Sequence, residues 1–296
     1  MVTTAIAHLN IGSRTDVGAV RSRNEDSVLT EPLGSADATA HGWLAIVADG
    51  LGGHRRGDLA SQLTVQTTRD TFYGRSHAQY TPERLRAAVE HANEVVLHTG
   101  EQSEATTEMA STITAAVIQG PKLTIAQVGD SRCYLIRNSR LRQITHDHSL
   151  VDELVRNGEI TPEEAQHHPN RNVITRALGT RPTVEVDLFE EDLHDDDVVV
   201  LCSDGLYRVV DESEIARALV SEPQLAAESL VALANQRGAP DNVTVVIVRV
   251  NISLQELEDA DRPAVSVPDE DTLPGGLKPV PQNEGETTLI RPHTGR

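Results

Sequence analysis

Three stretches of the chain are mainly apolar, two of them without interruption, and each has an aspartate at one end. An unbroken run of this length is typical of a strand buried on both faces, because a half-exposed strand alternates apolar and polar residues. The runs and their aspartates are 44–48 with Asp49, 198–202 with Asp204, and 243–250 with Asp241. A fourth apolar segment, 123–128, leads in the same way to Asp130. The pattern predicts four buried strands with carboxylates at their ends.

Other segments have the spacing of amphipathic helices or short strands. The range 81–100 predicts a helix that Thr81 caps and in which Pro82 takes the first position. Further helices are expected at 58–73, 212–220 and 223–236, and strands within 5–30 and at 111–119, 122–128, 132–137 and 184–189. Because strands and helices do not alternate regularly, antiparallel sheets covered by helices are expected, which is an α+β fold.

The aspartates at the strand ends indicate a cation site. A carboxylate at the end of a buried strand must be paired, hydrogen-bonded or bound to a cation. Asp49 is followed by Gly50, Gly52 and Gly53, which leave room for a ligand and for a backbone carbonyl beside the carboxylate. Magnesium and manganese prefer such oxygen donors. One such aspartate is equally well a turn residue, but four together favour a shared metal site.

Seven short motifs in a fixed order resemble the metal-dependent serine/threonine phosphatases of the PPM or PP2C type. They are RSRNEDS at 21–27, VADGLGGH at 47–54, MASTIT at 109–114, VGDSR at 128–132, THDHS at 145–149, CSDGLYRVV at 202–210 and APDNVTVVIV at 239–248. The resemblance extends from about residue 8 to 250 and is strongest to bacterial members, which partner Hanks-type kinases. It implies an αββα sandwich of two antiparallel β-sheets flanked by helices.

The resemblance also implies roles for individual residues. Asp49 bridges two Mn²⁺ or Mg²⁺ ions, Asp204 and Asp241 complete the ligands of one ion, and the Gly50 carbonyl serves the other. A hydroxide shared by the ions then attacks phosphoserine or phosphothreonine. The further residues implied are Arg21 as the phosphate-binding group, Asp130 with Asp204 at a weaker third ion, and Glu25 and Asp26 as ligands or supports of ligands.

The source of the proton for the leaving group stays open. Some relatives have a histidine directly after the Asp-Gly pair, and Leu51 occupies that position here. His54 and a metal-bound water are the two candidates.

Two other functions fit parts of the sequence. Residues 202–208 fit the C-x-x-G-x-x-R spacing of cysteine-dependent phosphatases, but Asp204 places a negative charge in the loop that would hold the phosphate, and nothing lowers the pKa of Cys202. A catalytically silent phosphoprotein-binding pseudophosphatase normally lacks a metal carboxylate. Because Asp49, Asp204 and Asp241 are all present, catalysis is favoured.

The composition of the chain limits the kinds of partner that it can bind and the compartment in which it works. The net charge of −19 argues against nucleic acid and anionic membranes. Two cysteines favour a reducing cytoplasm, and no apolar stretch reaches the roughly 18 to 20 residues that cross a bilayer. We therefore expect a cytoplasmic enzyme, a monomer, that acts on phosphorylated proteins.

The chain is expected to have a catalytic domain and a tail. The domain covers 1–250, with a polar flap at about 145–183 beside the active site, and 251–296 is a flexible, acidic, proline-rich tail. In the tail, Thr287 and Thr288 precede Ile290, an arrangement that resembles phosphothreonine ligands of forkhead-associated domains. A solvated tail without a partner is the alternative.

Overall fold

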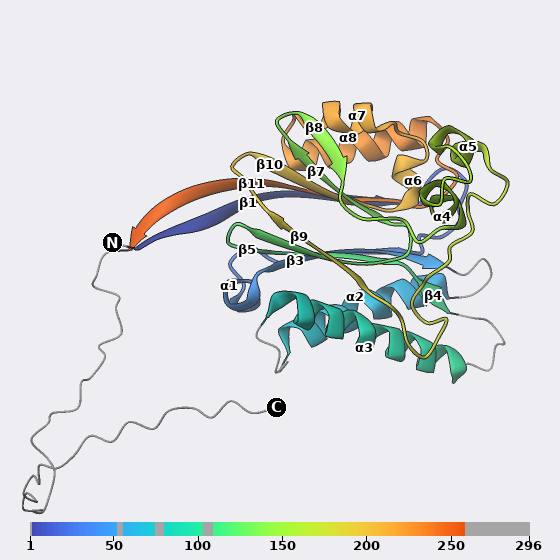
Figure 1. Cartoon of the computed structure of the whole chain (residues 1–296), viewed down its shortest axis with the longest axis horizontal. Coiled ribbons are helices and arrows are strands. Elements are labelled where there is room, and N and C mark those ends of the chain that lie inside the picture. The colour runs from blue at the N-terminus through green and yellow to red at the C-terminus, as the bar shows by residue number, and fades with distance from the viewer. Residues whose placement is uncertain (1, 52–55, 75–79, 103–108, 258–296) are drawn as a thin grey trace, which may run out of the picture. The chain divides into compact units, whose positions relative to one another are not determined.

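Two β-sheets face each other at the centre of the fold, and helices cover both outer surfaces (Figure 1). The computed structural model describes residues 2–51, 56–74, 80–102 and 109–257. The first sheet has the strand order β1-β11-β10-β7-β8, with bounds Val2–Asp16, Val243–Leu257, Asp197–Cys202, Arg132–Arg137 and Arg140–Gln143. The second has the order β2-β3-β5-β6-β9, with bounds Asp26–Thr30, Trp43–Leu51, Ile113–Gln119, Lys122–Val128 and Asp187–Asp192, and the short strand β4 (Ala110–Ser111) pairs with β3.

Helices of the two outer layers come from different parts of the chain. One sheet is covered by α2 (Gly57–Tyr73) and α3 (Thr81–Glu101), and the other by α7 (Glu212–Ala218) and α8 (Pro223–Gln236). The shorter helices are α1 (Ala36–His41), α4 (Leu150–Arg156), α5 (Pro162–His167) and α6 (Asp204–Tyr207). The resulting αββα sandwich of antiparallel sheets confirms the fold expected from the sequence.

The continuous apolar runs are explained by burial on both faces of each central strand. In β10, Val198, Val200 and Cys202 pack against α7 and α8, whereas Val199 and Leu201 pack between the sheets. The run in β3 divides in the same way: Ala45 and Val47 lie between the sheets, and Leu44, Ile46 and Ala48 face α2 and α3. Alternating side chains of these two runs thus fill two different cores, which explains why both faces of each run are apolar.

Some expected boundaries were wrong. The strand predicted at 184–189 is Asp187–Asp192, which pairs with β6 along one edge of its sheet. Thr81 does not cap α3, because Tyr80 occupies the capping position and the Thr81 hydroxyl donates to Gln119. Asp204 begins the helix α6 rather than ending a strand.

The compact unit runs from Val2 to Glu256, since β11 continues past residue 250 to Leu257. The segment 145–183 contains α4 and α5, joined by irregular chain; we call it the flap segment. Among the described residues, every helix is too short or too polar to cross a membrane. His54, Thr287 and Thr288, and the expected tail beyond Leu257, lie outside the described residues.

Candidate metal centre

Asp49 lies near the end of β3, between two neighbouring segments of the chain. Its register partner across β2 is Asp26. On the other side, the Asp49 amide donates to the Thr112 hydroxyl at 2.9 Å, and its carbonyl accepts from the Thr112 amide at 2.9 Å. Because both polar groups of the peptide are paired, the direction in which the Asp49 side chain leaves the strand is well defined.

The residue after Asp49 is a glycine because another backbone passes close to it. A Cβ on Gly50 would lie 2.1 Å from the Gly57 carbonyl oxygen and 2.6 Å from that of Glu25. The Gly50 amide donates to the same Glu25 carbonyl at 3.1 Å. Since backbone atoms cannot move aside as a flexible side chain could, the first turn of α2 requires glycine here.

Asp26 is held by the opposite sheet through two hydroxyl groups. Ser203 and Thr244 donate to Asp26 Oδ2 at 2.8 and 2.6 Å, and Ser203 is the residue that immediately precedes Asp204. The side chain of Asp26 therefore connects β2 with the chain that follows β10.

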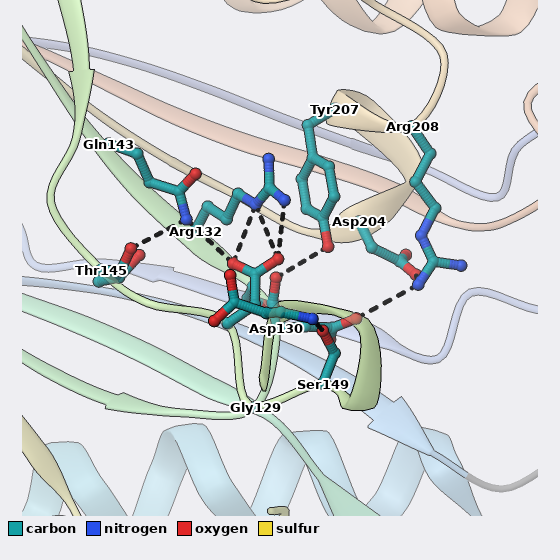
Figure 2. Close-up of polar contacts among 12 residues, drawn as sticks. Gly129, Asp130, Arg132, Gln143, Thr145, Ser149, Asp204, Tyr207 and Arg208 are labelled. Carbon is teal, nitrogen blue, oxygen red and sulfur yellow. Dashed lines mark hydrogen bonds and ion pairs between the residues drawn. The ribbon is translucent and has the colours of Figure 1, made fainter. Parts of the chain in front are cut away.

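Asp204 and Asp130 share one guanidinium group (Figure 2). Arg208 Nη2 lies 2.9 Å from Asp204 Oδ2 and 3.3 Å from Asp130 Oδ2. Tyr207, one residue earlier, donates its hydroxyl to the Asp130 carbonyl at 3.0 Å. These contacts place the turn between β6 and β7 against α6.

Asp241 lies in the loop before β11 and pairs with Arg21. The distance from Arg21 Nη2 to Asp241 Oδ2 is 2.7 Å, and Arg21 Nη1 is 3.9 Å from Glu25. The arginine side chain is 42% exposed, so it lies at the rim of the site.

Asn242 holds the loop that carries Arg21. Its Nδ2 donates to the carbonyls of Val17 and Arg23 at 2.8 Å each, and its Oδ1 accepts from the Glu25 amide at 2.8 Å. One buried side chain thus fixes three points of this loop.

Burial and mutual repulsion act together on the carboxylates. Burial, opposed by two hydrogen bonds and reinforced by Asp204, raises the pKa of Asp26 to about 7. Burial followed by repulsion from Asp204 raises the pKa of Asp130 to about 7. The pKa of Asp49 is raised well above its ordinary value by burial and then by its four acidic neighbours, and that of Asp204 is raised mainly by burial. Such a cluster favours protons or cations.

Unpaired oxygens give a test of whether a hard cation fits this cluster. Asp26, Asp130 and Asp204 each have a buried Oδ1 without a hydrogen-bond partner among the described residues. A buried carboxylate oxygen left unpaired is costly, and divalent cations with oxygen preference are its natural partners. The donor set therefore fits Mn²⁺ or Mg²⁺.

The side chains of the proposed ligands do not all converge on one position. Within the described ranges, no three His, Cys, Asp or Glu side chains have the spacing of a finished metal site. Asp241 Oδ2 is paired with Arg21, so ligation by that oxygen requires the ion pair to lengthen. Asp204 contacts Arg208 through Oδ2 and keeps its unpaired Oδ1 for a cation. Small side-chain rotations alter this spacing and leave the buried charges unchanged, so the donor chemistry still fits a hard cation.

The structure brings most of the predicted residues together and adds others. Asp204 lies within reach of Asp49, since a hydrogen bond to Asp49 is among the contacts that lower the pKa of Asp204. Arg208 and Asn242 were not predicted as site residues, although both lie within the motifs quoted above. An arginine four residues after Asp204 and an asparagine directly after Asp241 were the available signals.

An αββα sandwich whose sheets bring acidic side chains together in this way is the architecture of the metal-dependent protein phosphatases. The family model described as protein phosphatase 2C matches residues 20–239. The chain belongs to this family, and its activity is that of a metal-dependent serine/threonine phosphatase.

Known relatives agree in sequence and in fold. The serine/threonine phosphatase stp of Listeria welshimeri is 40% identical over 253 residues, which cover 83% of this chain and 98% of the relative. The crystal structure of the Mycobacterium tuberculosis phosphatase PstP/Ppp is 38% identical with a TM-score of 0.73, covering 82% of this chain and 99% of that one. A PstP catalytic domain in complex with two manganese ions is 37% identical with a TM-score of 0.71, covering 83% and 99%.

Proposed function

We propose that this chain removes phosphate from phosphoserine and phosphothreonine in proteins at a centre of two Mn²⁺ or Mg²⁺ ions. Asp49, the Gly50 carbonyl, Asp204 and Asp241 are the proposed ligands. The observation that carries this proposal is the buried group of carboxylates drawn from both sheets, with raised pKa values and unpaired oxygens. The relative PstP, which binds two manganese ions, supports the number of ions.

Ions bound here supply Lewis-acid chemistry, because they activate water and neutralise charge on the phosphate oxygens. Residues of the chain hold the proposed ligands in position. Thr112 fixes the Asp49 peptide, and Ser203 and Thr244 hold Asp26 beside it. We propose that Asp26 helps to hold the metal ligands in place from inside the protein. Glu25 has the same proposed role on the solvent side of the site.

Arg21 is the proposed phosphate-binding residue. Its guanidinium is at the rim of the site, charged at every working pH, and able to bind two phosphate oxygens at once. Its pairing with Asp241 places it beside a proposed metal ligand, and Asn242 fixes the loop from which it extends. Substrate phosphate and ions can therefore meet at one point.

The cysteine-dependent alternative is not favoured by the structure. Cys202 is completely buried in β10, and burial raises the pKa of its thiol to about 12. A nucleophilic cysteine needs the opposite, an accessible thiolate.

The substrates are phosphorylated proteins, as for the related serine/threonine phosphatases. We further propose that Hanks-type kinases supply these substrates, that the enzyme works in the cytoplasm, and that Thr287 or Thr288 docks a forkhead-associated protein when phosphorylated. The free, buried cysteines support the cytoplasmic assignment.

Turnover of a phosphothreonine peptide with Mn²⁺ tests the assignment of ligands. Asp49→Asn and Asp241→Asn should each lower kcat by at least about two orders of magnitude, because a charged ligand is lost while the side-chain volume is kept. Asp37→Asn, a change in the exposed helix α1, is the matched control and should keep full activity. Retention of most activity in either ligand variant contradicts the proposal.

A further inference from the structure

Arg208 lies where two buried acidic groups need a cation. Its Nη2 contacts Asp204 at 2.9 Å and Asp130 at 3.3 Å, so a single nitrogen serves two carboxylates (Figure 2). Asp130 is 2% exposed and Asp204 is 6% exposed. Because water cannot solvate these charges well, the guanidinium is their main compensation.

The same side chain also reaches the flap segment. Arg208 Nη1 donates to Asn172 Oδ1 at 2.6 Å, and Asn172 belongs to the irregular chain after α5. Arg208 is therefore a bridge with one nitrogen at the acidic pair and another at the flap segment. It also lines a cavity of about 500 Å³ between the flap segment and α6, together with Asp130.

We infer that Arg208 is a built-in cation that takes the place of a third divalent ion between Asp130 and Asp204, and that it ties the flap segment to the metal centre through Asn172. This inference rests on the proposed two-ion centre. A guanidinium is permanently charged, so it offsets one of the two negative charges at any metal concentration.

Arg208 and a further ion would compete for the same two carboxylates. While Arg208 is in place, a further ion at Asp130 would have to displace a positive charge and break the contact with Asn172. The Oδ1 atoms of Asp130 and Asp204 are unpaired among the described residues, and without Arg208 their Oδ2 atoms would also lose their ion pairs. That pair of carboxylates has the composition of a hard-cation site.

The test counts Mn²⁺ ions bound per chain, from the electron paramagnetic resonance signal of free Mn²⁺ during a titration. Arg208→Gln should bind one more ion than the wild-type chain, and adding Asp130→Asn to this variant should remove that ion. Arg171→Gln is the matched control, because Arg171 lines the same cavity without pairing with either carboxylate among the described contacts. It should leave the count unchanged.

Two further measurements keep the inference testable if Arg208→Gln folds poorly. Asp130→Asn in the otherwise wild-type chain should leave the ion count unchanged, because Arg208 already occupies the position between the two carboxylates. Asn172→Ala should also keep the count but speed amide hydrogen exchange in residues 168–176, because the flap segment loses its contact with Arg208.

Each result has a definite meaning. A folded Arg208→Gln chain with the wild-type count, or a wild-type chain that loses an ion on Asp130→Asn, overturns the inference. Failure of the proposed function gives a different result: Asp49→Asn would then leave the wild-type count unchanged, whatever happens at Arg208.

Discussion

Asp26 and Asp49 are directly opposite each other in the pairing of β2 with β3. Two acidic residues in such register normally repel and destabilise a sheet. Here the first is tied to Ser203 and Thr244 of the other sheet, and the second faces Asp204. The pairing of β2 with β3 therefore contains an unfavourable acidic pair. This pair concentrates negative charge at one point, as a metal-dependent enzyme requires.

The chelated protein should become more stable as the pH falls from 8 to 5. The pKa values of Asp26 and Asp130 rise from 3.8 to about 7 on folding, so the folded chain binds protons in this range that the unfolded chain does not. The stabilisation is complete below the unfolded pKa and is lost as the pH rises through about 7. Thermal melting in a chelator at several pH values measures this.

Saturating Mn²⁺ and Asp26→Asn are the controls for the pH dependence. Manganese should raise Tm at pH 8 more than at pH 5, because ions and protons compete for the same carboxylates. Asp26→Asn should flatten the slope. A chelated wild-type protein whose Tm is constant between pH 5 and 8 contradicts the pKa shifts.

Arg21→Ala should weaken substrate binding more than metal binding. The variant loses a charged contact to phosphate, so the KM for a phosphopeptide should rise by about 10-fold or more, while the Mn²⁺ affinity is retained. Arg23→Ala is the matched control. The Arg23 side chain is 77% exposed, and its ion pair with Asp58 is long, at 3.8 Å. Loss of metal affinity at an unchanged KM would mean that Arg21 is structural.

Asn242→Ala should cause part of the loss of substrate binding that is expected for Arg21→Ala, although Asn242 is not itself a proposed phosphate-binding residue. Removing its three hydrogen bonds frees the loop at Val17, Arg23 and Glu25, and should destabilise the fold by about 1–3 kcal/mol. A double-mutant cycle with Arg21→Ala measures the coupling. If the two changes add independently in kcat/KM, Asn242 does not position Arg21.

Cys202→Ser and Asp204→Asn separate the two phosphatase chemistries within one loop. Cys202→Ser places a hydroxyl in a dry strand and should lower Tm, but the manganese-dependent rate of the folded fraction should remain. Asp204→Asn should lose that rate. Activity that survives chelation and disappears in Cys202→Ser would establish the cysteine mechanism instead.

The local parts of the fold could be predicted from the sequence, whereas the contacts between distant segments could not. The apolar runs around Ala45 and Val199 specify strands because every residue in them is buried against one of two cores. The edge strand Asp187–Asp192 was misplaced, because its outward residues are polar and Val186, which packs in the core, lies outside it.

The same distinction holds for the candidate site. Asp49, Asp204 and Asp241 were recognisable as candidates because each adjoins an apolar run. The role of Arg208 was not, since it depends on Asp130 and Asn172, which are 78 and 36 positions away. Asn242 likewise acts on residues more than two hundred positions earlier. Such contacts depend on how distant parts of the chain fold together.

Both native thiols are fully covered, and this makes the protein a convenient background for spectroscopy. Cys133 and Cys202 have no accessible surface, and burial raises the pKa of each, so maleimide reagents should leave them untouched in the folded protein. A cysteine introduced at exposed Glu163 in α5 would then carry the only dye or spin label. Motion of the flap segment could be followed without first removing a native residue.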